Sequence, residues 1–155
     1  MKKLWADQHY RDKITKIKRV DTKKLWADPV YRERQTKCIL KARKQRPTGA
    51  ETKLYQLLQH LCHGEFQYNG SSADVVLAGH VPDFVNVNGK KQIIELFGCY
   101  WHGCRLCGHR AVVKNRNDQQ RLNDFRKLGW HPLVVWEHEL GTTKLETKVN
   151  NFINA

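Results

Sequence analysis

Long apolar runs are absent from this sequence, and so are cysteines spread along the chain in the manner of a disulfide framework. No stretch approaches the 18 or so apolar residues of a membrane helix, and none resembles the hydrophobic part of a signal peptide. We therefore expect neither a membrane partner nor secretion. The five cysteines are an odd number, and three of them fall within residues 99–107. This clustering argues against a disulfide framework and favours an intracellular, reducing setting with a metal site.

Acidic residues are rare in the first third of the chain. Residues 1–50 contain 16 Lys and Arg but only 5 Asp and Glu, which is +11 of the total charge of +13. Residues 51–155 are nearly balanced, with 12 basic and 10 acidic residues. A basic block of this kind is either a solvated surface or a binding surface for phosphates.

The basic segment contains a repeat with a period of 21 residues, in which residues 2–11 recur as residues 23–32. In the second copy Asp28 and Pro29 mark a helix start, and we expect helices over about 8–19 and 29–45. Two such units are too short for a core of their own. They either pack on the main domain or lie along double-stranded DNA, and their basic residues on several faces favour DNA. The candidate contacts are Lys2, Lys3, Arg11, Lys23, Lys24, Arg32, Arg34, Arg43 and Lys44.

A boundary near Pro47 separates this arm, residues 1–46, from a second domain, residues 47–155. Local signals predict the elements of the second domain. Thr48 and Glu51 form a capping-box pattern, and Asn88-Gly89 is typical of a two-residue hairpin turn. The expected elements are helices over 49–63, from about 115 or 117 to 129, and over 145–153, with strands over 81–87, 91–97 and 130–136. This order predicts an α/β fold around a mixed sheet.

Two kinds of metal ligand lie close together in the sequence. Zinc prefers four soft or borderline ligands, and Cys99, Cys104 and Cys107 supply three, with His109 the nearest candidate for the fourth. Asp83 and Glu95 lie inside apolar segments. Burying a carboxylate there costs free energy unless a metal ion or a hydrogen-bond donor pairs with it. Hard oxygen donors suit magnesium and phosphodiester hydrolysis. The alternative roles are a strand-end Asp in a turn and an exposed edge Glu.

Four motifs together resemble the very-short-patch-repair (Vsr) mismatch endonucleases, whose fold is a zinc-bearing variant of the PD-(D/E)xK nuclease core. The motifs span residues 82–84, 97–102, 128–130 and 134–137, and the resemblance covers about residues 49–155. It implies a restriction-endonuclease-like fold in which Asp83 binds magnesium and His102 acts as general acid and base. It also implies catalytic roles for Glu51 and Asp118, and it places His138 at a zinc-ligand position. Glu51 as a cap and Asp118 as a helix-start residue remain simpler alternatives.

The sequence departs from the Vsr pattern at Leu96-Phe97, where those proteins have Thr-His. A contact between the Thr and the metal, and one histidine, are therefore missing here. Glu95 replaces the metal contact if the broader PD-(D/E)xK pattern applies. The basic repeats are foreign to Vsr and resemble the DNA-binding modules of homing endonucleases. A group of these enzymes has a Vsr-like core with a Glu-Asp-x-His-Asp signature, which Glu51, Asp83, Leu96, His102 and Asp118 match.

The resemblance implies a magnesium-dependent, site-specific DNA endonuclease of the homing type, with structural zinc and a possible homodimer on DNA. It would act in the cytoplasm or nucleoid of a bacterial or phage-infected cell. A T·G mismatch nicking enzyme and a non-catalytic zinc-dependent DNA-binding protein remain alternatives.

Overall fold

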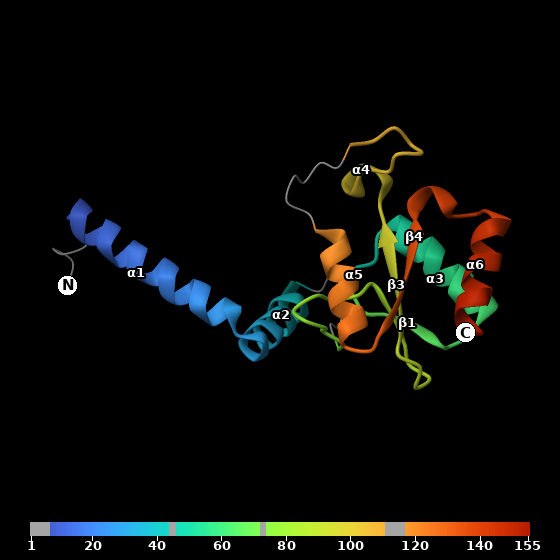
Figure 1. Ribbon diagram of the computed structural model, residues 1–155, viewed down its shortest axis with the longest axis horizontal. Helices are drawn as coiled ribbons and strands as arrows, with labels where there is room; N and C mark the ends of the chain where they lie inside the picture. The colour runs from blue at the N-terminus through green and yellow to red at the C-terminus, as the bar shows by residue number, and fades with distance from the viewer. Residues whose placement is uncertain (1–6, 44–45, 72–73, 111–116) are drawn as a thin grey trace.

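A computed structural model describes residues 7–43, 46–71, 74–110 and 117–155. It has a long helical arm joined to an α/β body (Figure 1). The elements, in chain order, are α1 (Gln8–Ala27), α2 (Pro29–Arg43), α3 (Gly49–Leu61), β1 (Phe66–Tyr68), β2 (Phe84–Asn86), β3 (Gln92–Phe97), α4 (Cys99–His102), α5 (Asp118–Lys127), β4 (His131–Trp136), the 3-10 turn η2 (Glu137–Glu139) and α6 (Thr143–Ile153). No described helix is both long and apolar enough to cross a membrane.

The two helices of the arm begin 21 residues apart, as the repeat predicts. Asp7 caps α1, and its carboxylate accepts a hydrogen bond from the His9 backbone at 2.8 Å. Asp28 does the same for Val30 at 3.0 Å, directly before α2. The expected end of the first helix at residue 19 is wrong, because α1 continues to Ala27. Neither glycine nor proline interrupts this stretch, so the next capping residue ends the helix.

The body is built on a four-stranded sheet in the order β1-β2-β3-β4. The first two pairings are antiparallel, and β3 pairs with β4 in parallel. Helices α3 and α6 cover one face and α5 covers the other (Figure 1). The predicted mixed sheet flanked by helices is therefore confirmed. The three-residue strand β1 was not predicted, because it is too short to show a period-two pattern.

Side chains of β3 alternate between two hydrophobic cores. Ile94 belongs to the core beneath α3 and α6, whereas Ile93 and Phe97 belong to the core beneath α5. Since successive side chains point to opposite faces, Glu95 lies on the α5 face. This separates Glu95 from α3, the helix that carries Glu51.

The hairpin between β2 and β3 forms, but its predicted two-residue turn is wrong. Phe84 pairs with Ile94, and Val85 with Ile93, so the connection is centred on Gly89 and spans residues 87–91. The Asn86 side chain accepts a hydrogen bond from the Asn88 backbone at 2.8 Å, which lengthens the turn, and Gly89 has a φ of 89°. In this register Asp83, one residue before β2, lies opposite Glu95.

Candidate active site and metal centre

Three cysteines and one histidine gather beside the end of β3. The donor atoms of Cys99, Cys104, Cys107 and His138 all lie within 4.8 Å of one another. The His138 Nδ1 atom is 3.2 Å from the Cys99 sulfur and 3.4 Å from the Cys104 sulfur. Tetrahedral zinc, with Zn–S near 2.3 Å and Zn–N near 2.0 Å, requires donors roughly 3.3–3.8 Å apart. The donor set therefore fits zinc.

The fold brings these four residues together through the parallel pairing of β3 with β4. Phe97 lies opposite Trp136, so the segments that follow both strands, containing Cys99 and His138, leave the sheet side by side. His138 is thus the fourth member of the cluster. His109, the alternative, lies outside it among the described residues, and its backbone instead donates to the Cys104 carbonyl at 3.0 Å.

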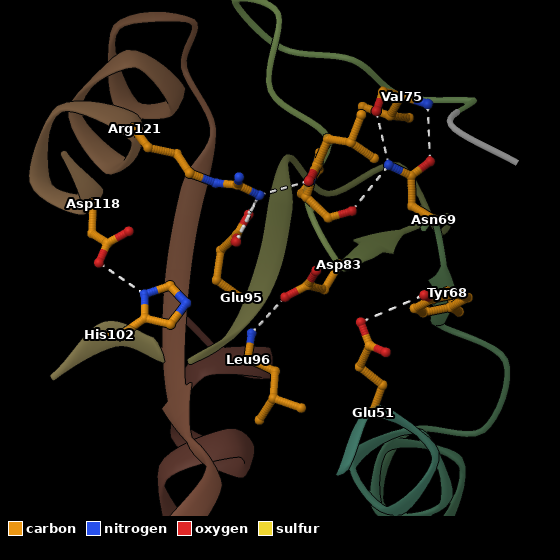
Figure 2. Close-up of polar contacts among 12 residues, drawn as sticks. Glu51, Tyr68, Asn69, Val75, Asp83, Glu95, Leu96, His102, Asp118 and Arg121 are labelled. Carbon is orange, nitrogen blue, oxygen red and sulfur yellow. Dashed lines mark hydrogen bonds and ion pairs between the residues drawn. The ribbon is translucent and has the colours of Figure 1, made fainter. Parts of the chain in front are cut away.

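His102 is the last residue of α4, the single turn that starts at Cys99. Its Nδ1 atom lies 2.8 Å from a carboxylate oxygen of Asp118, at the start of α5. Its ring stacks on Phe97 with centroids 3.9 Å apart, and only 7% of its side chain is exposed. If Nδ1 donates to Asp118, the Nε2 atom carries a lone pair suited to proton transfer. In Figure 2 this second nitrogen faces the side on which Asp83 lies.

Asp83 precedes β2 and is held from two directions. Its carboxylate accepts a hydrogen bond from the Leu96 backbone of β3 at 2.8 Å. Its carbonyl accepts one from the Asn69 backbone at 2.8 Å, and the buried Asn69 amide donates to the Pro82 carbonyl at 3.1 Å. Asn69 also exchanges two hydrogen bonds with the Val75 backbone, at 2.8 and 3.0 Å (Figure 2). These contacts of Asn69 were not predicted, since Asn69-Gly70 has the composition of an ordinary turn.

Glu51 has the predicted capping role and also faces a cavity. The Thr48 backbone donates to one Glu51 carboxylate oxygen at 2.6 Å, which completes the capping box. The other oxygen accepts a contact from the Tyr68 hydroxyl at 3.5 Å. The cavity beside it has a volume of about 560 Å³ and is lined by Thr48, Gly49, Ala50, Glu51, Leu96, Gly98, Trp101, His102 and Glu137. Glu51 and His102 therefore share one cavity with Leu96, the residue that holds Asp83.

Glu95 is buried, which contradicts the alternative of an exposed edge residue. Its side chain is 4% exposed, and both carboxylate oxygens lie 2.9 Å from one nitrogen of Arg121. The same nitrogen donates to the Val81 carbonyl at 2.6 Å, and the guanidinium lies over Phe125 with its carbon 5.6 Å from the ring centroid. Arg121 was not predicted as part of the site. A role of Glu95 in metal binding stays a prediction.

The predicted DNA contacts of the arm differ in exposure. Arg11, Lys23, Lys24 and Arg34 are exposed. Arg32 is half-buried against Gly79 of the body, where a Cβ atom on the glycine would lie 2.3 Å from the Arg32 Nε atom. Arg32 therefore also joins α2 to the body. Lys2, Lys3, Lys44 and the side chain of Arg43 lie outside the described residues.

No family model and no curated protein matches this chain. Among solved structures, the chain is similar to one titled "Homing Endonuclease I-Bth0305I Catalytic Domain". The two chains are 23% identical, with a TM-score of 0.44, over 70% of this chain and 92% of the other. Because the TM-score is below 0.5, we infer the function from the residues of the site and not from this similarity.

Proposed function

We propose that this chain is a magnesium-dependent, site-specific DNA endonuclease of the homing type with a Vsr-like PD-(D/E)xK core. The observation that carries the proposal is a shared cavity, lined by Glu51 and by a histidine that is already held in one orientation by Asp118. Asp83 adjoins this cavity through its hydrogen bond to Leu96. These are the residues of the Glu-Asp-x-His-Asp signature.

The oxygen donors of Asp83 and Glu51 suit magnesium, which is bound in proteins through one or two carboxylates together with substrate phosphates. When bound there, the cation supplies Lewis-acid stabilisation of charge on the phosphoryl oxygens. His102 accepts a proton from the attacking water or donates one to the leaving oxygen through Nε2. Asp118 fixes the ring and stabilises its charged form. Attack by water on phosphorus, with departure of the 3′ oxygen, leaves a 5′-phosphate.

The arm supports extended recognition of DNA over recognition of a single mismatch. Exposed Arg11, Lys23 and Lys24 are spread along a 20-residue helix none of whose described side chains is buried. Such a helix is about 30 Å long, close to one turn of B-DNA. A homing enzyme must find one long site among many competitors, which many weak contacts along the duplex achieve.

The first experiment is incubation of the zinc-loaded full-length chain with plasmid DNA carrying random inserts, with and without Mg²⁺. We expect Mg²⁺-dependent cleavage that is lost in Asp83→Ala and His102→Ala, whose zinc content stays unchanged. Cleavage restricted to T·G mismatches would select the repair enzyme instead. Absence of cleavage on every DNA, including a randomised library, would select the non-catalytic zinc-dependent DNA-binding protein.

Sequencing the ends produced from the randomised library tests the homing assignment. A preferred site longer than about ten base pairs supports it, and a mispaired base with few flanking preferences contradicts it. With one proposed active site in each chain, one strand is cut at a time. A double-strand break therefore requires a homodimer on DNA or two successive nicks, and the dependence of the cutting rate on protein concentration separates these two routes.

A further inference from the structure

Tyr68, at the end of β1, places its hydroxyl beside the candidate catalytic carboxylates. The hydroxyl lies 3.5 Å from a carboxylate oxygen of Glu51, and in Figure 2 the Glu51 carboxylate lies between the Tyr68 hydroxyl and Asp83. Tyr68 pairs with Phe84, the residue that follows Asp83, and Asn69, directly after β1, donates to the Asp83 carbonyl at 2.8 Å through its backbone. The backbone of β1 thus fixes the distance between the Tyr68 ring and Asp83.

The ring of Tyr68 is confined on two sides. Its edge packs on Phe84, with ring centroids 5.6 Å apart. On the other side Gly70 covers the tip of the ring, where an added Cβ atom would lie 2.3 Å from the hydroxyl oxygen and 2.5 Å from the adjacent ring carbon. Real Cβ contacts are never so short, so only glycine at position 70 leaves the hydroxyl where it is.

The surroundings keep this hydroxyl protonated. Burial raises the pKa of Tyr68 above its ordinary value of 10, and the negative charges of Glu51 and Asp83 raise it further. A neutral phenol is a hydrogen-bond donor, and the carboxylate that accepts from it here is that of Glu51. Glu51 then has one oxygen held by the Thr48 backbone and the other by Tyr68, which restricts rotation of its carboxylate.

We propose that Tyr68 is a positioning residue whose hydroxyl orients Glu51 toward Asp83 for binding of a divalent cation, and that Gly70 provides the space for this hydroxyl. The inference rests on the proposed function and deepens it. A contact of 3.5 Å is long for an O–H···O hydrogen bond. Contacts of this kind commonly shorten when the substrate and cation bind.

Tyr68→Phe removes the hydroxyl and keeps the ring. Tyr55→Phe is a matched control, because Tyr55 stacks on the same Phe84 ring with centroids 6.2 Å apart and its hydroxyl makes no hydrogen bond to the described residues. Two quantities are measured on the zinc-loaded full-length chain. The first is Mn²⁺ affinity without DNA, from the free-ion signal in electron paramagnetic resonance. The second is the Mg²⁺ concentration that gives half-maximal single-turnover cleavage.

We expect Tyr68→Phe to weaken Mn²⁺ binding and to raise the Mg²⁺ requirement, each about tenfold, the size typical of losing one hydrogen bond to a charged group. Gly70→Ala should act in the same direction, and Tyr55→Phe should match the wild type. In a Glu51→Gln background, Tyr68→Phe should have no further effect, since it acts through Glu51. A purely structural role of the ring gives additive losses instead.

Equal Mn²⁺ affinity in Tyr68→Phe and wild type overturns the inference, and so does an undiminished effect in the Glu51→Gln background. Weaker binding in Tyr68→Phe with unchanged binding in Glu51→Gln also overturns it, because the hydroxyl would then act on another group. If the wild type cleaves no DNA, the proposed function fails, whereas the Mn²⁺ comparison still decides the role of Tyr68.

Discussion

His102 and Asp118 link the cysteine-rich segment to helix α5, with 2.8 Å between Nδ1 and the carboxylate oxygen. His102 follows Cys99 by three residues on one helical turn, so a structural zinc at Cys99 also fixes the histidine backbone. Asp118 is the first residue of α5 after the capping Asn117. The orientation of the imidazole thus depends on the candidate metal cluster from one side and on α5 from the other.

The first prediction tests this pair with Asp118→Asn. The amide cannot stabilise the charged imidazole, so we expect the cleavage rate to fall by about 10²–10³-fold. Folding and zinc content should not change. Asp124→Asn is the control, because Asp124 lies on the same helix and contacts His80 at 3.7 Å, away from His102. Equal single-turnover rates in the two variants would show that Asp118 only favours the helix start.

The second prediction concerns the metal ligands. Cys104→Ser and His138→Ala should lose zinc and lower the melting temperature by several degrees or more, because a structural zinc contributes to folding directly. His109→Ala should keep a full complement of zinc, which metal analysis of purified protein measures. Loss of zinc in His109→Ala, with retention in His138→Ala, would reverse the assignment of the fourth ligand.

The third prediction concerns Glu95 and Arg121. Because one Arg121 nitrogen lies beside both oxygens of a buried Glu95, we expect Arg121→Met alone to lower the free energy of unfolding by about 3 kcal/mol, since loss of one partner of a buried ion pair is strongly destabilising. The double variant Glu95→Met, Arg121→Met should recover most of that loss. If Glu95 is structural, the double variant also retains cleavage within about tenfold. Full stability with cleavage abolished would instead identify Glu95 as a cation ligand.

The fourth prediction follows from His80, which lies between α5 and the arm. Burial lowers the pKa of His80, and the positive charges of Arg121 and Arg32 lower it further, although Asp124 opposes them. The unfolded chain therefore binds this proton more readily than the folded chain. The stability contributed by neutral His80 is present above the ordinary value of 6.5 and is lost as the pH falls through the lowered folded value.

Urea unfolding between about pH 7.5 and 5 measures this effect. His80→Gln should lose less stability over that range than the wild type, because it carries no titrating group at this position. His60→Gln, exposed on α3, should follow the wild-type curve. Parallel curves for His80→Gln and the wild type would contradict the prediction.

Features encoded in a few adjacent residues were predictable from the sequence. Asp28-Pro29 and the Thr48–Glu51 box start helices where expected, because capping needs only local backbone and one side chain. The three cysteines of the candidate metal cluster were equally visible. Tyr68, Asn69 and Arg121 were not, since their roles depend on which segments the sheet brings together. The hairpin turn was misjudged because the register of β2 against β3 centres the connection on Gly89, which residue types alone do not show.

The last prediction separates two kinds of basic residue in the arm. The exposed Lys23 and Lys24 belong to the set proposed to contact phosphates, whereas Arg32 is half-buried against Gly79. Each phosphate contact releases counterions, so losing one contact reduces the slope of log affinity against log salt by about one. We expect this reduction in Lys23→Ala and in Lys24→Ala. Deletion of residues 1–46 should leave a folded body that binds DNA weakly and with little salt dependence.

Arg32→Ala should behave differently, because the Arg32 guanidinium packs against Gly79 of the body and is only partly exposed to solvent. We expect a nearly unchanged salt slope but a less uniform set of cleavage positions, since the arm is no longer held against the loop that leads to Asp83. Gly79→Ala, which places a methyl group into the same contact, should reproduce this spread of cut positions. A salt slope reduced by one in Arg32→Ala, with cut positions unchanged, would mean that Arg32 binds a phosphate and that α2 does not set the distance between the DNA-binding arm and the cleavage site.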